Sequence, residues 1–175
     1  MPLKKLLPFL AASLLAPCLM ADESNSSERA AADAARLAEL DSYWATVARA
    51  VKAGDFALYR STCHPEGILV AGTRKNSEPL SQALARWKKE FDATRDGTRT
   101  SGLALRFSQR IGDATTAHET GMFLYTATTA EGKKIREFIH LEALLTKTKD
   151  GWKILMEYQK SVGTEAEWKA LPPGK

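Results

Sequence analysis

Cysteine and histidine are scarce in this chain of 175 residues, which contains two cysteines and three histidines. The histidines lie far apart in sequence, and no two have the spacing of metal ligands on one helix or strand. Glycine-rich phosphate loops, a Gly-x-Ser-x-Gly nucleophile motif and a Cys-His nucleophile pattern are also missing. The sequence therefore predicts neither a metal site nor a cofactor.

No run of charge of one sign occurs along the chain. The 25 lysines and arginines are distributed among 21 acidic residues, which gives a formal net charge of +4. A nucleic-acid surface usually needs basic residues gathered on one face. We therefore expect no nucleic-acid partner.

The N-terminal residues follow the pattern of a secretory signal peptide. Lys4 and Lys5 precede an apolar run that ends at Ala21, before a polar stretch. This run is broken by prolines and is shorter than the ~20 residues of a membrane span, so no stable membrane insertion is expected. We predict a signal peptide at 1–21, a polar leader at 22–34, and a periplasmic or secreted protein.

Cys18 leaves lipoprotein export open as an alternative, because lipid attachment uses a cysteine at the cleavage point. Pro17 stands where bacterial attachment sites normally have a small residue, which favours cleavage after Ala21. The mature chain would then keep Cys63 alone and could form no internal disulfide.

The first half of the chain predicts three helices. Apolar residues recur at three- and four-residue steps over 28–53, which indicates a long amphipathic helix. Gly54 ends this helix, and Asp55 can cap a short second helix that closes near His64. A β segment over 68–71 follows, and then a third helix capped by Asn76 or Ser77 with its buried stripe at Leu80, Leu84, Trp87 and Phe91.

The second half predicts strands joined by tight turns. Turn dipeptides separate four alternating segments, at 103–111, 114–128, 134–147 and 152–160. Helices followed by an antiparallel meander indicate an α+β domain over 35–161, with a C-terminal tail at 162–175. We expect a cone-shaped fold in which three N-terminal helices pack on a strongly curved, mainly antiparallel sheet.

Three sequence segments resemble a known superfamily. They are Gly54-Asp55 before the second helix, Ala117-His118-Glu119-Thr120-Gly121 in the middle strand, and Asp150-Gly151-Trp152-Lys153-Ile154 at the start of the last strand. In their order and spacing they are similar to the nuclear-transport-factor-two-like cone fold, in particular its SnoaL-like branch. The resemblance implies a pocket enclosed by sheet and helices, but this fold hosts isomerases, dehydratases, cyclases, binding proteins and oligomerisation modules.

Strand alternation predicts that Glu119 is a carboxylate of the pocket. It shares a face with the small residues Ala117 and Gly121 and with Tyr125, so it should point inward. It could act as a general acid or base, or it could be paired with a nearby arginine or hydroxyl group. A register shift of one residue would place His118 inward instead.

Alternation across the last hairpin predicts two more polar residues in the pocket. Pairing about Asp150-Gly151 places Glu137 on the same face as Tyr158, on an otherwise apolar wall. Tyr158 could then donate a hydrogen bond to a developing oxyanion, with Glu119 as the base. Further candidate ligand contacts are Trp44, His64, Glu66, Trp87 and Tyr125.

Three classes of function remain open at this stage. The first is an exported protein that binds a small, largely apolar molecule, and the second is a cofactor-free acid/base enzyme of isomerase, dehydratase or cyclase type. The third is a dimeric interaction module without a ligand. An apolar outer sheet face containing Phe138, His140, Leu144 and Leu155 predicts a homodimer in any of these classes.

Overall fold

The computed structural model describes residues 20–173, so almost all of the predicted signal peptide at 1–21 lies outside the described residues. The elements in chain order are α1 Met20–Ala53, α2 Phe56–Ser61, β1 Cys63–Ala71, the 3-10 turn η1 Gly72–Arg74, β2 Asn76–Pro79, α3 Leu80–Arg95, β3 Thr100–Gly112, β4 Thr116–Thr128, β5 Lys134–Thr148, β6 Gly151–Val162 and α4 Glu165–Ala170. Helices therefore precede the long strands, as the sequence predicted.

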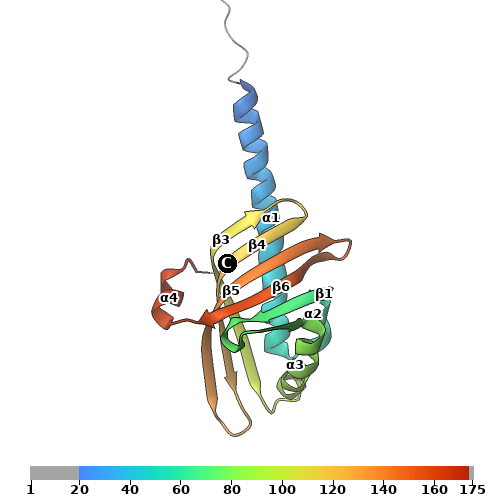
Figure 1. Ribbon diagram of the computed structural model, residues 1–175, viewed down its shortest axis with the longest axis vertical. Helices are drawn as coiled ribbons and strands as arrows, with labels where there is room; N and C mark the ends of the chain where they lie inside the picture. The colour runs from blue at the N-terminus through green and yellow to red at the C-terminus, as the bar shows by residue number, and fades with distance from the viewer. Residues whose placement is uncertain (1–19, 174–175) are drawn as a thin grey trace, which may run out of the picture.

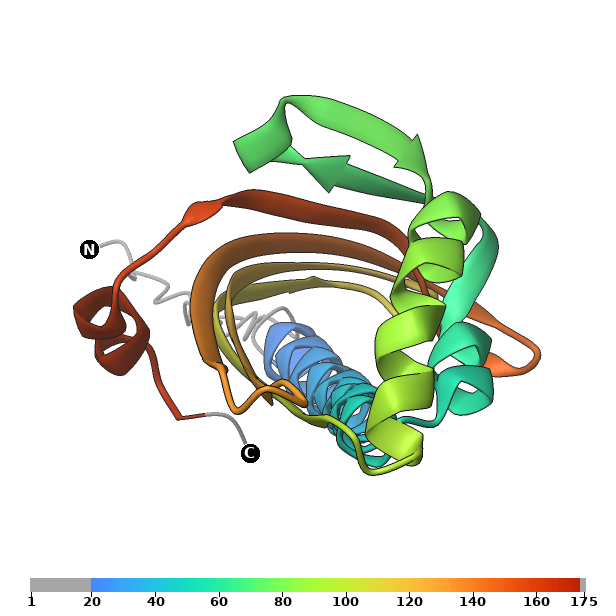
Figure 2. The same ribbon diagram turned by 90° about the horizontal axis from the view of Figure 1, so that it is seen from below.

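One six-stranded sheet forms the body of the fold, with the strand order β2-β1-β6-β5-β4-β3. All neighbours are antiparallel except β1 and β6, which run parallel. The sheet curls around α1, and α2 and α3 close one side of the curve (Figures 1 and 2). The predicted α+β cone, three helices on a curved and mainly antiparallel sheet, is confirmed.

Local sequence explains where α1 ends and α2 begins. Gly54 has φ +67°, and a Cβ there would stand 2.3 Å from the backbone nitrogen of Arg95, so only glycine fits where α1 meets the end of α3. Asp55 then caps α2, because its carboxylate accepts a hydrogen bond from the Leu58 amide at 2.9 Å. Both residues act as the sequence predicted.

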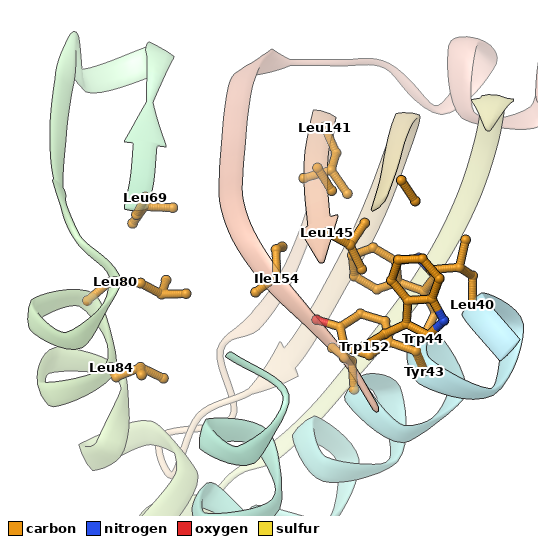
Figure 3. Packing of buried hydrophobic residues seen from close by; sticks show 14 residues of the cluster. Leu40, Tyr43, Trp44, Leu69, Leu80, Leu84, Leu141, Leu145, Trp152 and Ile154 are labelled. Carbon is orange, nitrogen blue, oxygen red and sulfur yellow. The ribbon is translucent and has the colours of Figure 1, made fainter. Parts of the chain in front are cut away.

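The main core lies between α1, α3 and the concave face of the sheet (Figure 3). Trp44 of α1 packs edge-to-face on Tyr43 and at 5.6 Å from Phe107 of β3. Leu40, Leu69 and Leu145 in this cluster are at most 1% exposed. This packing fixes α1 against the sheet and positions the residues around the cavity described below.

The C-terminal helix α4 packs on the opposite, convex face of the sheet. Trp168 is buried against Phe138 and Met122, and the Arg106 guanidinium donates to the Trp168 and Leu171 carbonyls at 3.1 Å each. Thr164 begins α4 with a capping box. Phe138, which we had expected on an open dimer face, is therefore covered by the chain's own C-terminal segment.

Several expected boundaries differ from the structure, among them the start of the first strand, which begins at Cys63 and not at residue 68. Residues 76–79 form strand β2 against β1 and do not cap the third helix, which begins at Leu80. The predicted polar leader is helical, because α1 already begins at Met20, and its side chains from 25 to 35 are exposed. This exposed part of α1 projects beyond the sheet in Figure 1.

The helices between residues 20 and 173 do not have the features of a membrane span. None of them is both long enough and apolar enough to cross a bilayer.

Candidate functional site

A cavity of about 600 Å³ lies between the concave face of the sheet and helices α1, α2 and α3. Its middle is apolar, with walls that include Val47, Trp87, Phe91, Leu105, Phe123 and Ile139. Its volume is within the range of small-molecule sites, and such sites usually combine an apolar wall with a few polar groups. Two separate polar groups meet this description, one at each end of the cavity.

The outer polar group is centred on Arg99, just before β3. Its Nη2 donates to the Tyr125 hydroxyl at 3.0 Å and lies 3.4 Å from a Glu90 carboxylate oxygen. Ser101 and Thr94 share a hydrogen bond of 2.9 Å beside it. The side chain of Arg99 is only 12% exposed, and its buried Nε has no partner in the described part of the chain.

The inner polar group is centred on Glu157 of β6. Its carboxylate accepts a hydrogen bond of 2.6 Å from the Gln159 side-chain amide, and both residues line the cavity. Tyr59 of α2 lines the cavity near Glu157, and its hydroxyl has no hydrogen-bond partner among residues 20–173. A carboxyl and a phenol are therefore both available to a molecule at this end.

Burial sets the protonation of these groups. Loss of hydration raises the pKa of Glu157, and the Gln159 amide opposes this in part. Burial, followed by the charge of Glu157, raises the pKa of Tyr59 well above its usual value, so the phenol remains a hydrogen-bond donor. Burial also raises the pKa of Cys63 to about 12, so its thiol stays protonated and is not an activated nucleophile.

Glu119 is fully buried and points to the concave side, but it does not line the cavity. One carboxylate oxygen accepts from the Trp44 indole and the other from Arg110 Nε, while Arg110 Nη1 lies 2.5 Å from Asp41. Both oxygens are thus occupied by structural partners. The sequence left open an acid/base role and a structural pairing with an arginine or a hydroxyl, and the structure supports the pairing, with Arg110 as the partner.

The register expected for β6 was wrong beyond Ile154. Ile154 pairs with Leu145 and Met156 with Leu144, so Leu155 is an extra residue in a β-bulge. The bulge turns Glu157 inward and places Tyr158 opposite Glu142 on the convex face. Tyr158 therefore lies outside the cavity. It is not in a position to donate a hydrogen bond to an oxyanion there, which is the role that the sequence predicted.

The other candidates divide into two groups. Trp44, Trp87, Tyr125 and Glu137 line the cavity, as expected from their faces. His64 and Glu66 do not line it. They lie in the irregular first part of β1, where the exposed Glu66 donates its backbone amide to the His64 ring at 3.2 Å.

His118 lies on the convex face, 3.7 Å from Glu142, so the alternative register with His118 inward is excluded. No group of three His, Cys, Asp or Glu side chains in the described residues is arranged to hold a metal ion.

Sequence reasoning missed Glu157 and the cluster around Arg99. No glycine, proline or asparagine marks the bulge at Leu155, so simple alternation assigned Glu157 to the wrong face. The stretch from 94 to 101 lies between the predicted third helix and the strand predicted at 103–111, so it belonged to neither element. Alternation did carry a signal there, because Ser101 has the parity of Leu103 and Leu105, which both line the cavity.

A pH dependence of stability follows from the raised pKa of Glu157. Ionisation is disfavoured in the folded state, so the stability contributed by the neutral carboxyl is present below the usual pKa of 4.5 and is lost as pH rises through the folded value. Glu157→Gln should therefore raise the melting temperature at pH 8 and leave it nearly unchanged at pH 4. Thermal unfolding followed by circular dichroism tests this, with Glu137→Gln at the exposed rim as the control. An equal change at both pH values would contradict it.

Comparison with known proteins identifies the fold. No protein-family model and no curated protein sequence matches the chain. Among solved structures, a conserved protein from Planctomyces limnophilus DSM 3776 aligns with a TM-score of 0.61 at 12% identity, covering 71% of this chain and 94% of that one.

Two further solved structures are named after protein classes. An NTF2-like (nuclear transport factor 2) superfamily protein from Salmonella enterica aligns with a TM-score of 0.53 at 14% identity, covering 73% of this chain and 91% of that one. A ketosteroid isomerase-like protein from Erwinia carotovora aligns with a TM-score of 0.52 at 18% identity, covering 70% and 92%. This chain has the NTF2-like fold, as its sequence predicted. Identities this low establish the fold alone, so the SnoaL-like branch stays a prediction.

Proposed function

We propose that this is an exported protein that binds a small, largely apolar molecule in the cavity between its sheet and helices. The cavity itself carries the proposal, because about 600 Å³ of space with an apolar middle and polar ends is what a ligand site requires. A protein without a ligand would gain stability by filling such a space with side chains. The predicted signal peptide supports export.

Export is tested by the N-terminus of the protein in its producing cells. We expect Asp22, or a residue within a few positions of it, to be the first residue found by mass spectrometry of the periplasmic or secreted fraction. Recovery of the full-length chain in the cytosol would contradict export and leave the binding proposal intact.

Acid/base catalysis is the second candidate, and the position of Glu157 favours it. The ionised form of a carboxyl with a raised pKa is a stronger base than usual, so the Glu157 carboxylate can accept a proton from carbon in the apolar cavity while the Tyr59 hydroxyl donates to a carbonyl oxygen. An isomerase, dehydratase or cyclase reaction would use these two roles. Glu119 no longer fits this chemistry, because its partners occupy both of its oxygens.

Proton exchange separates catalysis from binding alone. If the site is catalytic, the protein should accelerate exchange of the α-protons of 2-decanone in deuterium oxide, measured by nuclear magnetic resonance. Glu157→Gln should abolish the acceleration, whereas Glu142→Gln on the convex face should not. Exchange at the buffer rate with wild-type protein would leave binding as the function of the cavity.

The predicted homodimer now has a narrower candidate surface. An uncovered row crosses the convex face through Ile111, His118, Leu144, Met156 and Ile68, and its two end residues are about half exposed. Leu144→Lys should lower the mass measured by sedimentation from a dimer to a monomer, whereas Ala85→Lys on the exposed side of α3 should not. A wild-type monomer at high protein concentration would contradict the dimer.

A further inference from the structure

The two polar groups of the cavity lie well apart along the sheet. Glu157 pairs with Ala143 of β5, and Tyr125, the partner of Arg99, pairs with Glu137 of the same strand. Ala143 and Glu137 are six residues apart, so the two groups are at most about 20 Å apart along the strand, and the curvature of the sheet (Figure 2) and the inward reach of the side chains shorten this separation. A molecule that contacts both groups must therefore be elongated.

The outer group can accept an anion. Arg99 uses one guanidinium nitrogen for Tyr125 and Glu90, and its Nε and Nη1 have no hydrogen-bond partner in the described residues. The Arg99 side chain is only 12% exposed, and its buried Nε–H is costly to leave without an acceptor. A carboxylate matches the geometry of a guanidinium better than a neutral group does.

Two acidic residues lie near the outer group. Glu90 and Glu137 would repel an anion, but both are exposed and in contact with water, where their effect is screened. Arg74 also lines the cavity, but it is exposed and lies 3.7 Å from Glu78. Arg99 is the most buried of these four charged residues, so its positive charge has the largest effect on an anion inside the cavity.

The inner group suits a neutral polar atom. The Tyr59 hydroxyl is without a partner in the described chain, and Glu157 has only the Gln159 amide. A hydroxyl or carbonyl group can exchange hydrogen bonds with these two side chains without bringing a charge into the apolar interior. Leu105, Phe123 and Ile139 between the two ends offer contacts only to hydrocarbon.

We propose that the cavity binds an elongated amphiphilic acid, with its anionic group on Arg99, its apolar body along the middle wall, and a hydroxyl or carbonyl group at Tyr59 and Glu157. This proposal rests on the proposed binding function and names the chemical class of its ligand.

A set of ten-carbon probes tests each part of the proposal on the wild-type protein. Isothermal titration should give the order 10-hydroxydecanoate, decanoate, 1-decanol and decylamine, from tightest to weakest. Decanoate should bind at least about tenfold tighter than 1-decanol, the effect of one charge-assisted hydrogen bond. The added hydroxyl of 10-hydroxydecanoate should strengthen binding a further threefold or so.

Variants locate the two ends. Arg99→Gln should weaken decanoate binding at least about tenfold but change 1-decanol binding less than about twofold, because only the acid uses the guanidinium. Arg99→Lys should recover part of the loss. Arg95→Gln, a nearby exposed arginine, is the matched control and should change neither. Tyr59→Phe should remove the advantage of the terminal hydroxyl without affecting decanoate.

The outcomes separate this proposal from the binding function itself. Equal binding of decanoate and 1-decanol, or tightest binding of decylamine, would overturn the anionic end while leaving the cavity a ligand site. Failure of all four probes would overturn the proposed ligand class. The binding function would then be decided by non-denaturing mass spectrometry, which shows whether a molecule from the producing cells occupies the cavity.

Discussion

Replacing Glu119 with glutamine should lower the free energy of unfolding by about 3 kcal/mol, the lower end of the cost of breaking a buried ion pair. Glu119 is fully buried, and the variant loses the charge that compensates Arg110. We take the lower end because Arg110 keeps Asp41, and glutamine keeps an acceptor for the Trp44 indole. The melting temperature should fall by roughly 6–12 °C for a domain of this size.

Glu142→Gln is the matched control for this effect. Glu142 lies on the neighbouring strand and is also ion-paired, but it faces outward and contacts the exposed Lys160 at 2.5 Å. A pair of this kind contributes less than about 1 kcal/mol. Chemical denaturation of both variants gives the comparison, and a Glu119→Gln variant as stable as the wild type would refute the structural role of Glu119.

Replacing Leu105 with tryptophan should weaken binding of 10-hydroxydecanoate by at least about 100-fold, or roughly 2.7 kcal/mol. Leu105 lines the middle of the cavity beside Phe123, its pairing partner on β4. A larger ring at this position therefore fills the space that the apolar body of a ligand needs. Stability should stay the same or rise, because the added atoms enter existing space and displace no packed side chain. Isothermal titration and thermal unfolding measure the two effects.

The neighbouring position supplies the control for cavity filling. Ala104 is exposed on the other face of β3, so Ala104→Trp adds the same ring outside the cavity and should leave binding unchanged. Unchanged affinity in Leu105→Trp would mean that the probe binds elsewhere. A loss of both stability and binding would point to overpacking, and Leu105→Phe, with its smaller ring, should then still weaken binding.

The sequence was sufficient for the architecture because periodicity and turn chemistry act locally. The positive φ values of Gly132 and Gly151, +79° and +91°, are those that tight turns require, and these residues were visible as turn signals. Gly54 and Asp55 likewise separate α1 from α2 as predicted. The inward direction of Glu119 also followed correctly from its small neighbours on β4.

The site was harder to predict because two β-bulges change the alternation. In β3, a shift between Phe107 and Gln109 turns Arg110 inward beside Glu119, although its parity matched the outward residues. In β6, the shift at Leu155 turns Glu157 inward and Tyr158 outward. Neither segment contains a residue typical of a bulge, so only the paired strands reveal that Glu157, and not Tyr158, faces the cavity.

The most direct test of the binding function is non-denaturing mass spectrometry of the protein recovered from the cells that produce it. We expect a retained molecule, one per chain, that is absent from Leu105→Trp and present in Ala104→Trp prepared in the same way. Incubation of ligand-stripped protein with a lipid and metabolite extract of those cells should restore the same added mass. Wild-type protein that carries no molecule after both procedures would contradict the conclusion that the cavity is a ligand-binding site.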